Sequence, residues 1–199
     1  MTIQLIIALV IFLFPLAYSP GPGNIFFATN GARFGLLSTL PLTSGYHLAT
    51  FIVTLAIGLG LVSVLNQFPI IFSSIKILGA LYVLWLAWKL VRSGILTDTR
   101  EPKPAGFWDG VVLMVLNPKA YFIIAVMFSQ FLDPETDNLF EWVIWISIVF
   151  TINNLIAFSL WTVLGDTLAR TFRNKRNAKR LNTIFGSTLA LVAIWMFFI

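Results

Sequence analysis

Cysteine is absent from the 199 residues, acidic residues number 8, and histidine occurs once. Without cysteine the chain has no disulfide framework, no thiolate nucleophile and no cysteine-based metal site. The sequence also lacks a cluster of His, Asp and Glu with metal-ligand spacing, a Gly-rich phosphate loop and a Ser-His arrangement. We therefore expect no enzyme activity, no bound metal and no cofactor.

Charge of either sign is scarce. Charged residues make up 11% of the chain, less than half of the roughly 25% that is usual for soluble domains. No charged residue occurs in 1–32, 142–165 or 181–199, and the mean hydropathy is +0.90. Uncharged runs of roughly 20 residues are typical of transmembrane helices. The sequence predicts an all-α polytopic membrane protein.

Six apolar runs are each long enough to cross a bilayer as a helix, the form in which an open chain satisfies its own backbone polar groups. They cover residues 3–30, 40–65, 70–90, 107–132, 141–165 and 181–199. The first run also resembles a secretory signal peptide, with Ala17-Tyr18-Ser19 after its apolar stretch. It lacks a basic n-region and Pro20 would follow the cleavage point, so we interpret it as a retained span.

Basic residues indicate how the spans are oriented. Eleven of the 13 lie in the first, third and fifth connections, whereas the second and fourth connections and both tails have none. Since positively charged connections stay in the cytoplasm, both termini should lie outside. This pattern explains the net charge of +5 better than nucleic-acid binding does, and we expect the six basic residues in 170–180 to contact anionic lipid headgroups.

The spans form one membrane domain with two parts of three spans each, 1–99 and 100–199. An odd number of spans gives the two parts opposite topology, as in transporters built from inverted repeats. The leading span of each part also contains a proline break. The breaks are Pro20-Gly21-Pro22-Gly23-Asn24 in the first span and Asn117-Pro118-Lys119 in the fourth.

The first break contains two prolines that remove helical donors and two glycines that weaken the helix further. It forms either a loop at the membrane edge or a discontinuous helix whose free N–H groups face a polar ligand. We favour the discontinuous helix, because an apolar run continues from Ile25 to Ala28 and irregular backbone at this depth must line a cavity or be buried in protein.

Lys119 lies about twelve residues inside its span, near the membrane midplane. Placing a lysine there costs roughly 2.5–3.5 kcal/mol on insertion scales, so it needs a counter-charge, a water-filled cavity or a ligand. No span has a carboxylate at matching depth. Lys119 is therefore our candidate for binding an anionic group such as a substrate carboxylate, with structural pairing as the alternative. Lys76 is closer to the outer end of its span and can snorkel.

Three other polar residues lie inside the spans. His47 is the one intramembrane side chain whose ordinary pKa is near neutrality, which makes it the candidate for proton coupling. A hydrogen-bonded structural histidine is the alternative. Asn153 and Asn154 lie midway along the fifth span, where they either join helices or line a cavity.

These features together resemble the LysE/RhtB superfamily of amino-acid exporters over essentially the whole chain. The resemblance rests on six spans in about two hundred residues, the two proline motifs, a glycine-rich second span, the segment 78–89 and Phe107-Trp108-Asp109-Gly110. It implies efflux of amino acids or small relatives across the bacterial inner membrane, driven by the proton motive force. The signature positions carried over are Pro20, Gly21, Pro22, Gly23, Asn24, Asn117, Pro118 and Lys119.

Many members of this superfamily have an acidic residue in the second span, whereas Gly45-Tyr46-His47 has none, so His47 becomes the residue to test for coupling. A dibasic substrate would need a buried carboxylate, which the spans lack. We therefore predict a secondary transporter for small neutral amino acids or derivatives of the threonine, homoserine, leucine or cysteine kind, possible as a homodimer. The alternatives are a basic amino-acid exporter of the same superfamily and an uncoupled channel-like or structural membrane protein.

Overall fold

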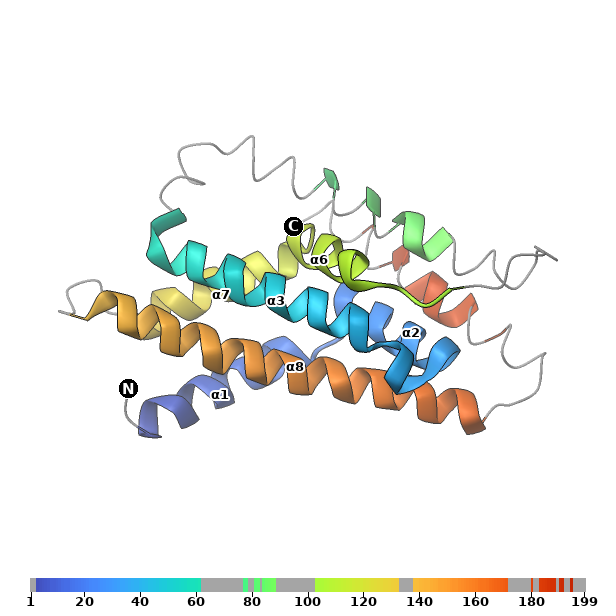
Figure 1. Ribbon diagram of the computed structural model, residues 1–199, viewed down its shortest axis with the longest axis horizontal. Helices are drawn as coiled ribbons and strands as arrows, with labels where there is room; N and C mark the ends of the chain where they lie inside the picture. Colours follow the sequence, from blue (N-terminus) through green and yellow to red (C-terminus); the bar gives the residue numbers. More distant parts are fainter. Residues whose placement is uncertain are drawn as a thin grey trace.

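The computed structural model describes residues 3–61, 103–132 and 138–171, with scattered residues between 77 and 88 and between 180 and 194. The elements in these residues are helical (Figure 1). They are α1 (Ile3–Tyr18), α2 (Pro22–Ser38), α3 (Leu40–Ala56), the π-helix η1 (Ile57–Leu61), α6 (Phe107–Val115), α7 (Pro118–Phe131) and α8 (Leu139–Thr171). The expected spans 70–90 and 181–199 fall largely outside the described residues, so the six-span inverted repeat stays a prediction.

Two of the described helices are long and apolar enough to cross a membrane, Leu40–Gly60 and Leu139–Arg170. Two further candidates are helix pairs that pass the same test together but are sharply bent. The α1–α2 pair bends by 68° and the α6–α7 pair by 62°. Both bends fall at the proline motifs where the sequence predicts a break in the helix.

The first break lies inside the protein, since Gly21, Pro22, Gly23 and Asn24 are buried and Pro20 alone is exposed. A helix that ends inside a membrane leaves carbonyl groups that need donors. Side chains supply these donors to four successive carbonyls. Ser19 Oγ donates to Leu16 at 3.1 Å, Asn24 Nδ2 to Ala17 at 2.9 Å, Trp161 Nε1 to Tyr18 at 3.2 Å and Lys119 Nζ to Ser19 at 2.7 Å.

The prolines determine where the helices resume after each break. Pro22 and Pro118 are the first residues of α2 and α7, a position where the missing N–H and the fixed φ of proline suit a helix. Asn117 is the N-cap of α7, and its side-chain oxygen accepts a hydrogen bond from the Lys119 N–H at 3.2 Å. Tyr121 Oη donates to the Val115 carbonyl at 2.9 Å, which satisfies the end of α6.

At two helix crossings, glycines allow the backbones of the two helices to come into direct contact. A Cβ added at Gly31 or Gly165 would collide with a carbonyl of the facing helix, and these two positions bring α2 against α8. Gly45 and Gly110 do the same between α3 and the N-terminal part of α6. At the same end of the molecule, Asn30 donates to Thr39 Oγ1 at 3.0 Å and accepts from the Ala105 N–H at 3.2 Å.

Candidate functional site

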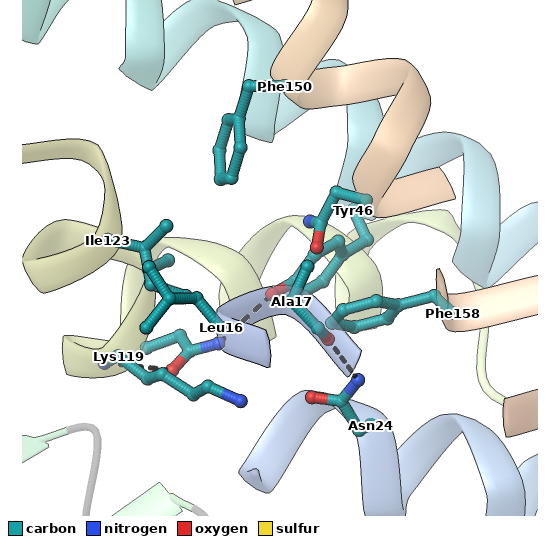
Figure 2. A pocket seen from close by; sticks show the side chains of 11 residues that line it. Leu16, Ala17, Asn24, Tyr46, Lys119, Ile123, Phe150 and Phe158 are labelled. Carbon is teal, nitrogen blue, oxygen red and sulfur yellow. Dashed lines mark hydrogen bonds between the residues drawn. The ribbon is translucent and has the colours of Figure 1, made fainter. Parts of the chain in front are cut away.

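A polar pocket lies where the two breaks meet (Figure 2). Its lining comes from α1, α2, α3, α7 and α8 and from the residue between α6 and α7. The lining residues are Leu16, Ala17, Asn24, Tyr46, Asn117, Lys119, Ala120, Ile123, Phe150, Asn154 and Phe158. Its free volume of about 10 Å³ is near the minimum for one water molecule, so the pocket must widen to admit an amino acid.

Lys119 is the cation of this pocket and connects its two broken helices. Its Nζ donates to the Ser19 carbonyl at 2.7 Å and to Ser19 Oγ at 3.0 Å. A Cβ added at Gly21 would lie 2.8 Å from Lys119 Cδ and 3.0 Å from Nζ, so the lysine occupies the space that this glycine leaves. Within the described part of the chain Lys119 forms no ion pair, and its positive charge is left available to an anion.

The pocket wall opposite Lys119 is aromatic. The rings of Tyr46 and Phe158 lie 4.6 Å apart between centroids, and Phe27 packs edge-on against both at 5.4 and 4.8 Å. Gly23 is required here, because an added Cβ would lie 2.8 Å from the Phe158 ring and 3.2 Å from the Tyr46 hydroxyl. The residues of the first break therefore contact Lys119 on one side and this aromatic group on the other.

His47 is buried behind the aromatic wall and does not line the pocket. Its ring faces those of Phe27, Tyr46 and Phe158, with centroids 5.3 to 6.1 Å away. Nδ1 lies 2.8 Å from the Thr43 carbonyl, which can only accept, so Nδ1 carries the hydrogen. Nε2 is then the atom that can take up a proton, and it is buried without a hydrogen-bond partner among the described residues.

The two asparagines of α8 have different surroundings. Asn154 lines the pocket, and its side chain lies beside the Tyr46 hydroxyl. Asn153 is equally buried at 5% exposure but lies outside the pocket lining, and its Nδ2 has no hydrogen-bond partner among the described residues. Of these two residues, the geometry therefore brings Asn154 alone to the space between the breaks.

The structure brings together Asn24, Asn117, Lys119 and Asn154 of the residues that the sequence singled out, with Gly21 and Gly23 as close contacts. Pro20, Pro22, Pro118 and Asn153 stand outside the lining and His47 stands behind it. Sequence reasoning missed Tyr46, Phe150 and Phe158. Tyr46 left a detectable signal, because a tyrosine in the interior of an apolar span needs a partner for its hydroxyl.

Helices of membrane length, two of them broken around a polar pocket, define a multi-pass membrane protein with the arrangement common in secondary transporters. The chain belongs to the LysE type translocator family, whose model matches residues 14–198. This confirms the resemblance drawn from the two proline motifs.

Relatives in the family have names that describe an activity. A cysteine/O-acetylserine efflux protein of Salmonella typhimurium is 30% identical over 183 residues, covering 92% of each chain. A protein of the same name from Escherichia coli (strain K12) is 27% identical over 182 residues, again covering 92% of each chain. No solved structure matches the chain.

Proposed function

We propose that the chain exports a small neutral amino acid or a close derivative, of the cysteine and O-acetylserine kind, across the bacterial inner membrane. The observation that carries this proposal is the Lys119 ammonium, which lies at the junction of both breaks in a pocket whose described lining residues include no carboxylate. The names of the relatives support the same class of substrate.

Lys119 binds the substrate carboxylate in this proposal. Two of its three ammonium hydrogens are directed at Ser19, which leaves one for a ligand. The first turn of α2 begins at Pro22 without a side-chain cap, so its free N–H groups and the positive end of the helix dipole favour an anion at the same place. Asn24 and Asn154 supply amide oxygens for the substrate ammonium.

A neutral side chain fits the rest of the pocket. The apolar lining comes from Leu16, Ile123, Phe150 and Phe158, together with two alanines. A lysine or arginine substrate would bring a second positive charge into this lining, and none of its described residues has a carboxylate to pair with that charge. Burying an unpaired charge is expensive, and we therefore favour a neutral substrate over a basic one.

Transport proceeds by alternating access around this pocket, with the proton motive force as its energy source and His47 as the coupling group. The tight glycine crossings of α2 with α8 and of α3 with α6 lie at the end of the molecule that the charge pattern assigns to the cytoplasm. They would have to separate to admit a substrate from that side. In this proposal both chain termini lie outside the cytoplasm, and two copies of the chain form a homodimer.

Counterflow in proteoliposomes tests the proposed function. Vesicles are loaded with unlabelled cysteine, O-acetylserine, threonine, homoserine, leucine or lysine, and uptake of the labelled counterpart is followed. Wild type should exchange a neutral amino acid with saturation, and Lys119→Ala should abolish the exchange. Lys103→Ala is the matched control, because Lys103 is exposed and distant in sequence from the break, and its exchange should equal that of wild type.

Three results would contradict the proposal. Exchange of lysine that Lys119→Ala abolishes would indicate a basic amino-acid exporter. Flux that does not saturate and does not respond to a trans substrate would indicate a channel. Exchange that survives in Lys119→Ala would remove Lys119 from the binding site.

A further inference from the structure

We infer that the Tyr46 hydroxyl donates a hydrogen bond to the substrate carboxylate, as the partner of Lys119 in one anion-binding site. This inference rests on the proposed function and adds a residue to it. Tyr46 lies on α3, and its side chain is 1% exposed to solvent and lines the pocket. Among the described residues that line the pocket, it is the one with a hydroxyl group.

The orientation of the Asn117 amide is the first step of the argument. A backbone N–H can only donate, so the atom of Asn117 that lies 3.2 Å from the Lys119 nitrogen must be the side-chain oxygen Oδ1. The other end of the amide is therefore the NH₂ group. This group lies 3.0 Å from the Tyr46 oxygen and donates to it.

The direction of that hydrogen bond determines what Tyr46 can do. Because Asn117 donates, the Tyr46 oxygen accepts, and the hydrogen of the hydroxyl must point elsewhere. Its remaining polar neighbour is the side chain of Asn154, which also lines the pocket. Among the described residues no group accepts the hydroxyl hydrogen, which is therefore available at the pocket wall to the oxygen of a ligand.

The donors of the pocket are otherwise largely in use. Asn24 Nδ2 donates to the Ala17 carbonyl at 2.9 Å and Asn117 Nδ2 to Tyr46. Lys119 has one hydrogen left, and the Tyr46 hydroxyl and the Asn154 amide are the other polar groups that remain. A carboxylate has two oxygens and accepts from two donors best. Asn117 joins Tyr46 directly to the first turn of the Lys119 helix, so these two donors belong to one hydrogen-bonded unit.

Tyr46→Phe tests the inference, since it removes the hydroxyl and keeps the ring. A hydrogen bond to a charged group contributes about 1.5–3 kcal/mol, so the KM for counterflow should rise by roughly 10-fold or more. The rise should be similar for every exchanged amino acid, because all share the carboxylate. Inhibition of exchange by the corresponding decarboxylated amine, which has no acceptor at this position, should be unchanged.

Tyr121→Phe is the matched control. Like Tyr46→Phe, it removes a tyrosine hydroxyl and keeps the ring. The Tyr121 hydroxyl donates to the Val115 carbonyl, and Tyr121 does not line the pocket. Its KM should stay at the wild-type value. A Tyr46→Phe variant with normal KM and a lower maximal rate would assign the hydroxyl a structural role and overturn the inference. A rise in KM confined to substrates with polar side chains would also overturn it.

Failure of this inference can be told apart from failure of the proposed function. If wild type exchanges no amino acid, both fall together. If wild type exchanges and Tyr46→Phe leaves KM unchanged, the inference alone falls. Should Tyr46→Phe not fold, 3-fluorotyrosine at position 46 keeps the hydroxyl and makes it a stronger donor, so KM should fall, and an unchanged KM would contradict the inference.

Discussion

At the scale of single residues, the hydrogen bonds of several buried polar groups determine what those groups can do. His47 shows this most clearly, because its Nδ1 hydrogen is held by the Thr43 carbonyl while Nε2 stays open among aromatic rings. Those rings carry no charge, so protonation of Nε2 would place a new positive charge among buried, uncharged side chains. The electrostatic energy of this new charge would differ between two conformations of the helices, and a proton-coupled step needs such a difference.

His47→Asn separates coupling from binding. The asparagine amide can replace the Nδ1 hydrogen bond to the Thr43 carbonyl, but it cannot take up a proton. Counterflow at equal pH should persist within about threefold, as expected when a buried hydrogen bond is roughly retained. Efflux from loaded vesicles, which should accelerate for wild type when the outside is more acidic than the inside, should lose this acceleration in the variant. An acceleration equal to that of wild type would exclude His47 as the coupling residue.

At the scale of helices, both breaks follow from local rules, and the sequence alone predicts them. Proline cannot continue a helix but can begin one, so α2 and α7 start at Pro22 and Pro118. The bond from Lys119 to Ser19 joins residues 100 positions apart and depends on how the helices pack. No local pattern contains that information. The sequence shows that the Tyr46 hydroxyl needs a partner inside its span, but the identity of that partner, Asn117, also depends on how the helices pack.

The crossing of α2 with α8 gives a prediction for helix packing. Gly165→Ala would push a methyl group into the backbone carbonyl of Ala28, where no side chain can move aside. Overpacking of this kind costs about 1–3 kcal/mol, and the unfolding temperature of the detergent-purified protein should fall by several degrees. Tryptophan fluorescence recorded during heating measures this unfolding temperature.

Gly106→Ala is the control for this measurement. Gly106 precedes α6 with a negative φ of −96°, and the nearest atom to an added Cβ is Asp109 Oδ2 at 3.7 Å, an ordinary contact. Its unfolding temperature should stay close to that of wild type. Equal effects of the two substitutions would show that α2 and α8 are less tightly packed than the structure indicates.

At the scale of the whole molecule, orientation in the membrane follows from charge. The helix α8 runs from Leu139 to Thr171, long enough to bring its two ends to opposite faces of a bilayer. The connection before it is acidic, and six basic residues lie in its last turn and in the connection after it. A split this complete predicts the acidic end outside and the basic end in the cytoplasm.

Topology reporters test this orientation. Alkaline phosphatase, which is active outside the cytoplasm, should be active when fused after Asp137 and inactive after Lys175. A green fluorescent protein fused at the same two positions should give the complementary pattern. The reverse pattern would place both termini in the cytoplasm. The glycine crossings would then lie at the outer end of the molecule.

The hydrogen bonds from Lys119 to Ser19 have a consequence for the working range of the proposed exporter. Two of the three ammonium hydrogens are held by Ser19, so a substrate carboxylate shares the charge with the chain and gains one hydrogen, which weakens capture and hastens release. The wild-type KM should therefore lie toward the upper end of the usual micromolar-to-millimolar range. Such an exporter transports little of a metabolite at its normal cytoplasmic concentration and becomes active when the metabolite accumulates.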